Sequence, residues 1–432
     1  MRKKGRAVPE WLNSPIWSAT PPAPAPPDPY GVDLAPPPPL KPPPPAVAPP
    51  VPPPPSYEQA VGAGGGRGDE EDEGAGAVIR AQLLSDFKAA LSKKVVNMGE
   101  LRRLACLGVP DGGGAVRPVV WKLLLGYLPT DRSLWAYELE KKRSQYSAYK
   151  EEFLLNPSEK LRRMEETKLS RKKELNIERI GFLPRLEVTN EEHPLSSGKS
   201  SLWNQYFQDS EILEQIDRDV KRTHPDISFF SSKSNQESLR RILIIFSKLN
   251  PSIRYVQGMN EVLAPLFYVF KNDPDPSSSA SAEVDTYFCF VELLSGFRDN
   301  YCKHLDNSSV GIRSTLSKLS QLLKRHDEEL WRHMEVTTKV YPQYYAFRWI
   351  TLLLTMEFSF NVCIHIWDAI LGDPEGPSDT LMRICCAMLI LVRKRLLAGD
   401  FTANIQLLQH YPATNIDHLL HIANRLRGTI AG

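Results

Sequence analysis

A change in composition near residue 77 constrains this chain more than any other feature. Three runs of four prolines precede it, and a glycine run and an acidic run follow them. Proline fixes φ and has no backbone N–H, so neither a helix nor a central strand forms through such runs. The segment also has too few apolar side chains to offset the entropy cost of ordering. We therefore predict a disordered, proline- and glycine-rich tail over residues 1–77, partly in polyproline II conformation.

One short motif in this tail has a known type of partner. Pro54-Pro55-Ser56-Tyr57 matches the P-P-x-Y ligands of WW domains. A proline-rich tract that contains a tyrosine also produces this motif by chance, so both interpretations stay open.

From Val78 onward, apolar residues recur at helical spacing, and alternating strand patterns are absent. The sequence predicts one large all-α domain over residues 78–432, and no repeat of fixed period favours a solenoid. A polar insertion is expected at about residues 130–200. The predicted helices cover residues 79–96, 98–107, a segment opening at 117–118, 209–221, 234–249, 261–270, 284–294, 314–323, 345–358, 361–371, 380–397 and 416–426.

Basic clusters in the insertion, such as Lys141-Lys142-Arg143, indicate either a solvated helix surface or a patch that faces an acidic partner or phospholipid. The chain as a whole has 53 Lys and Arg against 51 Asp and Glu, a formal net charge of +2. This balance disfavours a nucleic-acid-binding protein, which usually has a strong basic excess. The six cysteines include no C-x-x-C pair and suggest reduced core residues of a cytoplasmic protein.

No secretory signal is visible, and the longest apolar stretch, residues 384–392, is far too short to span a bilayer. No metal cluster is expected, because His418 and His421 lack companion ligands. Gly198-Lys199-Ser200 is similar to the end of a phosphate-binding loop, but the required earlier glycine is His193. We therefore expect no nucleotide site and no cofactor of its own in this chain.

Arg222 follows a short charged helix, and Thr223-His224-Pro225 ends that helix. The spacing places Asp219 and Arg222 on neighbouring turns, at i and i+3. An arginine at a helix terminus can project outward and neutralise charge on a phosphate. It can equally form a surface ion pair of small energetic value.

Gln257 lies between two apolar helices, in the sequence Tyr255-Val256-Gln257-Gly258-Met259. Gly258 permits a sharp turn that other residues disfavour. The amide of Gln257 can orient a water molecule, or it can satisfy unpaired backbone groups at a helix start. The sequence alone does not choose between these roles.

Together these segments resemble the finger motifs of the TBC-domain family, the GTPase-activating proteins for Rab GTPases. The family pattern I-x-x-D-x-x-R aligns with Arg222, and Y-x-Q-G-M aligns with Gln257. The resemblance extends over about residues 98–375. Its other blocks are Leu101-Arg102-Arg103-Leu104 with Gly108-Val109-Pro110, then Arg117-Pro118-Val119-Val120-Trp121, and finally Phe347-Arg348-Trp349, Glu357-Phe358 and Ile366-Trp367-Asp368.

The resemblance implies that Arg222 and Gln257 are catalytic fingers supplied to a Rab GTPase, which itself carries GTP and Mg²⁺. Asp219 is then expected to hold Arg222, and Tyr255 and Gly258 to set the loop of Gln257. The protein would be cytoplasmic and would contact trafficking membranes indirectly, through its partner. The alternative is a non-catalytic Rab-binding or scaffold protein that uses the same fold and the proline-rich tail.

Overall fold

Most segments in which apolar residues recur at helical spacing form helices in the part of the chain that this computed structural model describes. The described residues are 69–111, 114–154, 162, 202–302, 305–306 and 308–427. Within these ranges β-structure is limited to one isolated bridge between Val95 and Asp131. The all-helical prediction is therefore confirmed. The Pro54–Tyr57 motif, most of the predicted tail, the Gly198–Ser200 sequence and residues 163–200 of the predicted insertion lie outside the described residues.

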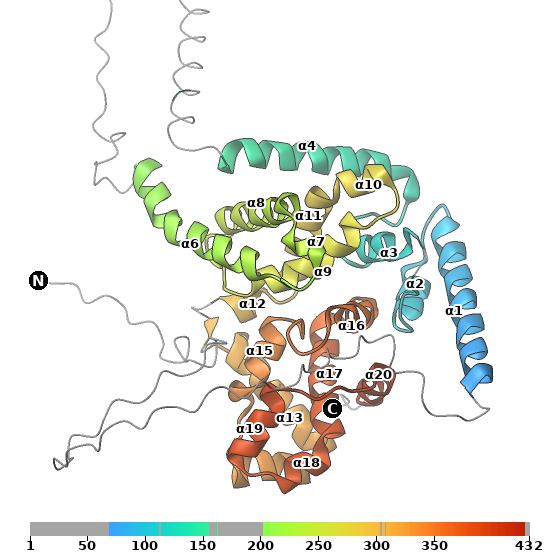
Figure 1. Cartoon of the computed structure of the whole chain (residues 1–432), viewed down its shortest axis with the longest axis vertical. Helices are drawn as coiled ribbons and strands as arrows, with labels where there is room; N and C mark the ends of the chain where they lie inside the picture. The colour runs from blue at the N-terminus through green and yellow to red at the C-terminus, as the bar shows by residue number, and fades with distance from the viewer. Residues whose placement is uncertain are drawn as a thin grey trace, which may run out of the picture. The chain divides into compact units, whose positions relative to one another are not determined.

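The first half of the domain consists of α1 (Asp69–Ser92), α2 (Met98–Ala105), α3 (Val116–Leu124), α4 (Trp135–Phe153), α6 (Leu202–Arg222), α7 (Ser228–Ser231), α8 (Lys233–Leu249), α9 (Met259–Lys271), α10 (Pro276–Ala280) and α11 (Ala282–Ser295) (Figure 1). The second half consists of α12 (Arg298–Tyr301), α13 (Ile312–His326), α14 (Glu328–Trp331), η6 (Arg332–Thr337), η7 (Pro342–Tyr344), α15 (Ala346–Thr351), α16 (Phe360–Gly372), α17 (Pro377–Leu391), α18 (Arg393–Ala398), α19 (Phe401–Gln409) and α20 (Ile416–Arg425). A short helix η3 (Arg132–Leu134) precedes α4 in the first half.

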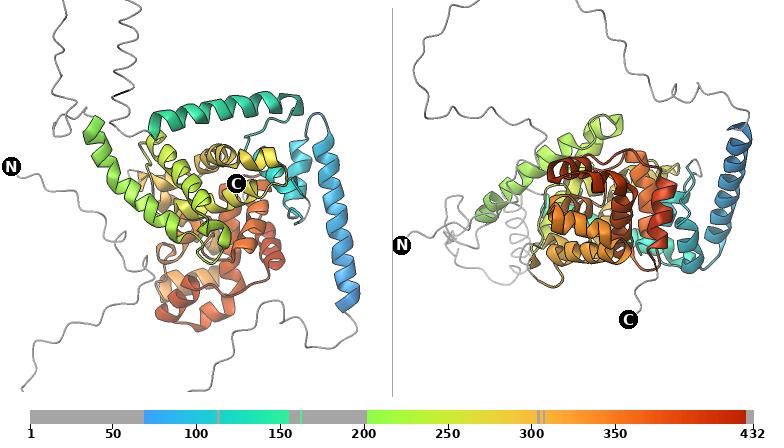
Figure 2. Two further views of the ribbon diagram at one scale, coloured as in Figure 1. Left: turned by 45° about the horizontal axis from the view of Figure 1, so that its top comes forward. Right: turned by 90° about the horizontal axis from the view of Figure 1, so that it is seen from below.

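Helix α16 connects the two halves of this arrangement. It packs against α2, α3 and α9 on one side and against α17 and α20 on the other (Figures 1 and 2). Its side chains are apolar nearly all round, and Ile366, Trp367 and Ile370 are buried. A helix with this pattern is stable only when it is enclosed by other elements.

Two long apolar runs form shorter helices than we predicted. Residues 345–358 give only α15, because the chain turns after Thr351 and places Leu353 and Leu354 at positive φ. Both leucines are buried, and Trp367 Nε1 donates a hydrogen bond to Leu353 O at 3.1 Å. Core packing therefore outweighs helix propensity in this turn. Residues 380–397 divide into α17 and α18 around Val392.

At the other end of the domain, α1 begins earlier than the boundary expected at Val78. It starts at Asp69 and includes the acidic run. Acidic residues are favoured in the first turns of a helix, where the macrodipole is positive. In the predicted insertion, α4 packs against α8 and α11 and buries Tyr146, so this part of the segment contributes to the core.

A buried carboxylate joins the first helices of the domain to α16. Asp368 accepts hydrogen bonds from Val109 N at 3.0 Å, Arg117 Nε at 3.2 Å and Trp121 Nε1 at 2.7 Å. Gly372, at the end of α16, makes a close approach there, because a Cβ on it would lie 2.7 Å from the Cβ of Ala105. The segment from residue 98 to residue 124 is thus held to α16 by both polar bonds and close packing.

We expect Asp368→Ala to lower the free energy of unfolding by about 3–5 kcal/mol, because it leaves the largely enclosed Arg117 guanidinium without its main partner. Asp111 offers a matched control. It also pairs with Arg117, but its side chain is 67% exposed, so Asp111→Ala should cost less than about 1 kcal/mol. Urea denaturation of the two variants measures both effects, and equal losses would contradict this account.

Candidate functional site

Arg222 is the last residue of α6, and its helix positions it through a buried face. Ile216 and Val220 of this helix lie in the core. The Arg222 side chain is 54% exposed, and its Nη2 lies 2.8 Å from Asp219 Oδ1. The helix that we expected to be short spans 21 residues, so Arg222 terminates a long, packed element. One edge of the guanidinium is held while much of the side chain remains accessible.

Asp219 is the centre of the site, although none of its side chain is exposed. Its Oδ1 accepts a hydrogen bond from Gln215 Nε2 at 2.8 Å and forms an ion pair with Arg222 Nη2, also at 2.8 Å. Its Oδ2 accepts one from the hydroxyl of Tyr255 at 2.6 Å. A buried carboxylate is tolerated only when it is paired and hydrogen-bonded in this way. Asp219 thus connects the end of α6 to the turn that precedes α9.

Gln257 is exposed in that turn, between α8 and α9. Gly258 caps α9 with φ 97°, in the left-handed region that favours glycine. A Cβ on Gly258 would lie 2.5 Å from Leu352 Cδ2, so the turn rests directly on the chain that follows α15. The conformation at Gly258 therefore depends on both backbone geometry and packing.

Tyr255 is half-buried and joins Gln257's turn to α6. Its hydroxyl donates to Asp219 Oδ2 at 2.6 Å and lies 3.2 Å from Asn260 Oδ1. Burial, together with the adjacent Asp219 carboxylate, raises the pKa of Tyr255 well above its usual value. The phenol therefore keeps the proton that it donates to Asp219.

The structure joins three of the five predicted site residues by hydrogen bonds or ion pairs: Asp219, Arg222 and Tyr255. Gln257 and Gly258 follow Tyr255 in the same turn. Among the described residues, no hydrogen bond or ion pair connects Arg222 directly to Gln257. The two side chains are therefore presented separately, from two elements that share one buried anchor.

Four further polar residues lie at this junction, and none of them had a predicted role in the site: Thr223, His224, Asn260 and Glu261. Asn260 Nδ2 donates to Asp219 O at 3.3 Å, to Thr223 Oγ1 at 2.9 Å and to Glu261 Oε1 at 2.7 Å. The available signal was the polar pair at 260–261 directly before the apolar run of α9. A polar pair at the start of a buried helix needs partners in the interior.

Glu261 is a buried carboxyl group beside this cluster. Burial is the main cause that raises its pKa to about 7, although Asn260 and Arg222 oppose the shift. His224 Nε2 lies 3.3 Å from Glu261 Oε2, and the ring packs against Phe230 and Phe360. Burial lowers the pKa of His224, which favours its neutral form. In the folded protein the Glu261 carboxyl group therefore loses its proton near neutral pH as the pH rises.

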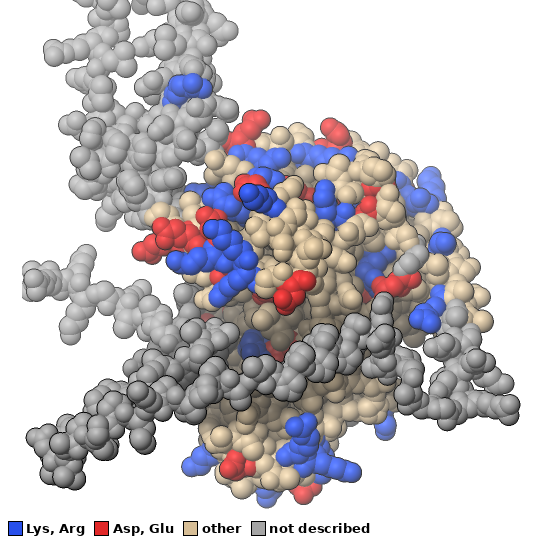
Figure 3. Space-filling model, viewed as in Figure 1, with Lys and Arg blue, Asp and Glu red and all other residues tan. Residues whose placement is uncertain are grey.

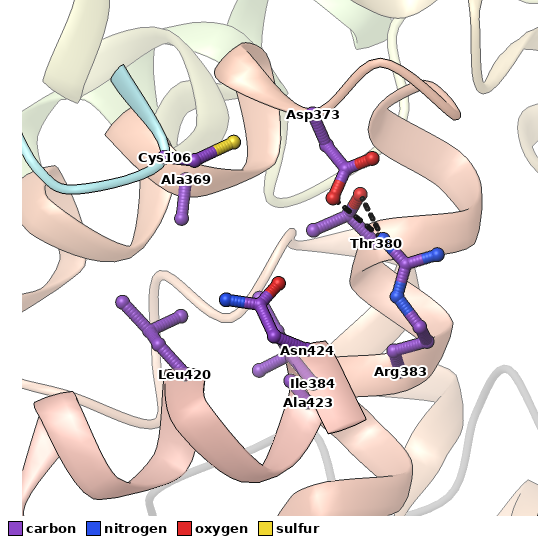
Figure 4. Close-up of a pocket in the computed structure, with 9 residues that line it drawn as sticks. All are labelled: Cys106, Ala369, Asp373, Thr380, Arg383, Ile384, Leu420, Ala423 and Asn424. Atoms are coloured by element: carbon purple, nitrogen blue, oxygen red, sulfur yellow. Dashed lines mark hydrogen bonds and ion pairs between the residues drawn. The ribbon is translucent and has the colours of Figure 1, made fainter. Parts of the chain in front are cut away.

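Other parts of the described structure offer weaker candidates. A hollow between α16, α17 and α20 is lined in part by Cys106, Asp373 and Arg383, but it has space for only about one water molecule (Figure 4). In the described ranges, no group of three or more His, Cys, Asp or Glu side chains could hold a metal ion. On the face seen in Figure 3, basic and acidic side chains are intermixed over the described helices.

The Glu261→Gln variant should change the pH dependence of stability. The folded protein holds this proton up to about pH 7, whereas an unfolded glutamate releases it near 4.5. Stability therefore falls as pH rises from about 4.5 through 7, and Gln removes this loss, which we expect to be roughly 1–3 kcal/mol.

Urea denaturation at pH 5, 6, 7 and 8 measures the difference between Glu261→Gln and the unmodified protein. Glu152 is exposed on α4, and Glu152→Gln is the matched control that should leave the profile unchanged. Parallel profiles for Glu261→Gln and the unmodified chain would refute the titration of Glu261 in this range.

Comparisons with known proteins identify the family. Residues 182–397 match the family described as RabGAP-TBC, the Rab-GTPase-TBC domain. TBC1 domain family member 13 from Mus musculus and from Homo sapiens is 35% identical, over 80% of this chain and 97% of each relative. The crystal structure of the Ypt/Rab-GAP domain of Gyp1p has a TM-score of 0.61 and 27% identity, and it covers 80% of this chain and 97% of that one. This chain belongs to the Rab-GTPase-TBC domain family.

Proposed function

We propose that this chain accelerates GTP hydrolysis by a Rab-type GTPase, with Arg222 and Gln257 acting in trans on the partner's nucleotide. Membership of the Rab-GTPase-TBC domain family supports the class of partner. The similar fold of Gyp1p, which is a Ypt/Rab-GAP domain, supports the same class. In this proposal GTP and Mg²⁺ belong to the GTPase, and the chain contributes only side chains to the reaction.

Arg222 would stabilise the charge that develops on the β- and γ-phosphates. A guanidinium has five N–H donors in a planar fork, so the bond to Asp219 leaves other donors for phosphate oxygens. Because the Asp219 carboxylate already holds one edge, less side-chain entropy is lost when Arg222 meets the nucleotide. An arginine finger of this kind contributes on the order of 10³–10⁵ in rate.

Gln257 would orient the water that attacks the γ-phosphate. A primary amide has both donors and an acceptor, which allows it to bind the water and the phosphoryl group together. The exposed position of Gln257 and the constrained backbone at Gly258 are compatible with this role.

The observation that carries the proposal is the shared anchor. Asp219 bonds Arg222 through one carboxylate oxygen and Tyr255 through the other. An ordinary surface ion pair forms without a fully buried carboxylate that is also hydrogen-bonded to a turn distant in sequence. This arrangement fixes the element that ends in Arg222 relative to the turn that presents Gln257.

The proposal includes a place of action. None of the helices that the structure describes combines the length and the apolar character needed to cross a bilayer. We propose that the protein is cytoplasmic and reaches trafficking membranes through its lipid-anchored GTPase. A WW-domain partner at Pro54-Pro55-Ser56-Tyr57 stays a prediction from sequence.

Arg222→Ala should lower the rate of single-turnover GTP hydrolysis on a responsive Rab by at least tenfold, because the transition-state charge loses its cation. A panel of GTP-loaded Rabs identifies the responsive one. Arg332→Ala is the matched control, since Arg332 is also exposed and pairs with Glu328 one turn earlier. Undiminished hydrolysis with Arg222→Ala would leave the chain as a Rab-binding or scaffold protein.

Gln257→Ala should also lower the rate at saturating activator by at least tenfold, because the attacking water is no longer oriented. Gln257 is exposed, so the free energy of unfolding should change by less than about 0.5 kcal/mol. Gln406→Ala, which removes an exposed glutamine from α19, is the control. If Gln257→Ala and Gln406→Ala have the same rate, the water-orienting role is wrong.

A further inference from the structure

One buried amide, that of Asn260, contacts the chain on both sides of Arg222 and also Tyr255, just before Gln257. Asn260 Nδ2 lies 3.3 Å from Asp219 O and 2.9 Å from Thr223 Oγ1, so it touches the chain before and after Arg222. Its Oδ1 lies 3.2 Å from the hydroxyl of Tyr255, two residues before Gln257. Asn260 itself follows Gln257 by three residues and is 1% exposed.

These contacts also complete the end of α6. The last four carbonyls of a helix have no partner within the regular i to i+4 pattern. Thr223 N bonds to Val220 O rather than to Asp219 O. The Asp219 carbonyl instead accepts hydrogen bonds from Thr223 Oγ1 at 2.9 Å and from Asn260 Nδ2. The C-terminus of α6 is therefore capped by a side chain from the first turn of α9.

We propose that Asn260 is a positioning residue that sets the direction in which Arg222 leaves α6 relative to Gln257. The inference rests on the proposed function and adds a residue to it. Because Asn260 is 1% exposed, it would act through Asp219, Thr223 and Tyr255 rather than on the nucleotide directly. Without its amide, the end of α6 and the turn before α9 lose one of the polar links between them, and the separation of the two fingers is less tightly fixed.

The geometry favours this role over that of an ordinary core amide. Asn260 has two N–H donors and three nearby acceptors, one of which is Glu261 Oε1 at 2.7 Å. Its donors are thus shared between the end of α6 and its own helix. Small errors in the placement of reacting groups reduce rates strongly, about 10²-fold for displacements near 1 Å. Loss of this link should therefore appear in catalysis.

The test is a double-mutant cycle in single-turnover hydrolysis with a responsive GTP-loaded Rab and the full chain. We expect Asn260→Ala to lower the rate at saturating activator by roughly tenfold or more and to change the half-saturating concentration by less than about threefold. In the Arg222→Ala background the same substitution should lower the rate by less than about threefold. Non-additivity of this kind is not expected from a purely structural residue.

Asn404 provides a matched control for the substitution. It is equally buried, and its amide caps the end of α18 by donating to Leu396 O at 2.9 Å and Gly399 O at 3.3 Å. Asn404→Ala should lower the free energy of unfolding and leave the saturated rate unchanged. If Asn260→Ala does not fold, Thr223→Val tests the same link by removing only the hydroxyl, and Thr223→Ser should restore the rate.

The outcomes separate this inference from the proposed function. Loss of rate with Arg222→Ala but not with Asn260→Ala and Thr223→Val would overturn the inference alone. The inference would also be overturned if Asn260→Ala lowered the hydrolysis rate by the same factor in the unmodified chain and in the Arg222→Ala background. A change in the half-saturating concentration without a change in the saturated rate would overturn it as well. No effect of Arg222→Ala itself would overturn the proposed function, and the positioning role would fall with it.

Discussion

The candidate site depends on one buried carboxylate, that of Asp219. Asp219 has no contact with solvent, so its charge must be balanced by protein groups: Gln215 and Tyr255 donate hydrogen bonds to it, and Arg222 forms an ion pair with it. Two of them are on α6 and one is in the turn before α9. Satisfying one buried charge therefore fixes the positions of two chain segments that are separated by α7 and α8 in sequence. The energetic cost of burying this charge is offset only while that geometry persists.

The site combines a rigid base with accessible tips. In its interior, Asn260, Thr223 and Glu261 are buried, and they are bonded to one another or to the end of α6. Gly258 packs on Leu352. At its surface, Arg222 and Gln257 are exposed. Reacting groups that must meet a separate macromolecule have to be exposed, and groups that must be accurate have to be held. The division between buried polar residues and exposed ones is the one that the proposed finger mechanism requires.

Sequence reasoning recovered the parts of this arrangement that local spacing determines. The i, i+3 separation of Asp219 and Arg222 predicted their pairing, and the all-helical class followed from the 3.6-residue period. The approach of Tyr255 to Asp219 was not predictable from spacing, because it joins residues 36 apart. Asn260 was missed for the same reason, since its partners Asp219, Thr223 and Tyr255 lie far from it in sequence. Glu261 was missed with it, because its contact with His224 is also distant in sequence. The turn at Leu353 and Leu354 was missed because burial of two leucines in a left-handed conformation is decided by packing rather than by local propensity.

The hydrogen bonds of Asp368 also indicate that the folding unit extends beyond the residues that match the family. The family match covers residues 182–397, yet Val109, Arg117 and Trp121 supply the donors of this carboxylate, and α20 packs on α17 after that range. A recombinant fragment trimmed to the matched range would strip α16 of its polar partners and uncover apolar surface on two sides. Such a fragment would be prone to aggregate, so shortened versions for crystallisation or assay should begin before Met98 and extend past Arg425.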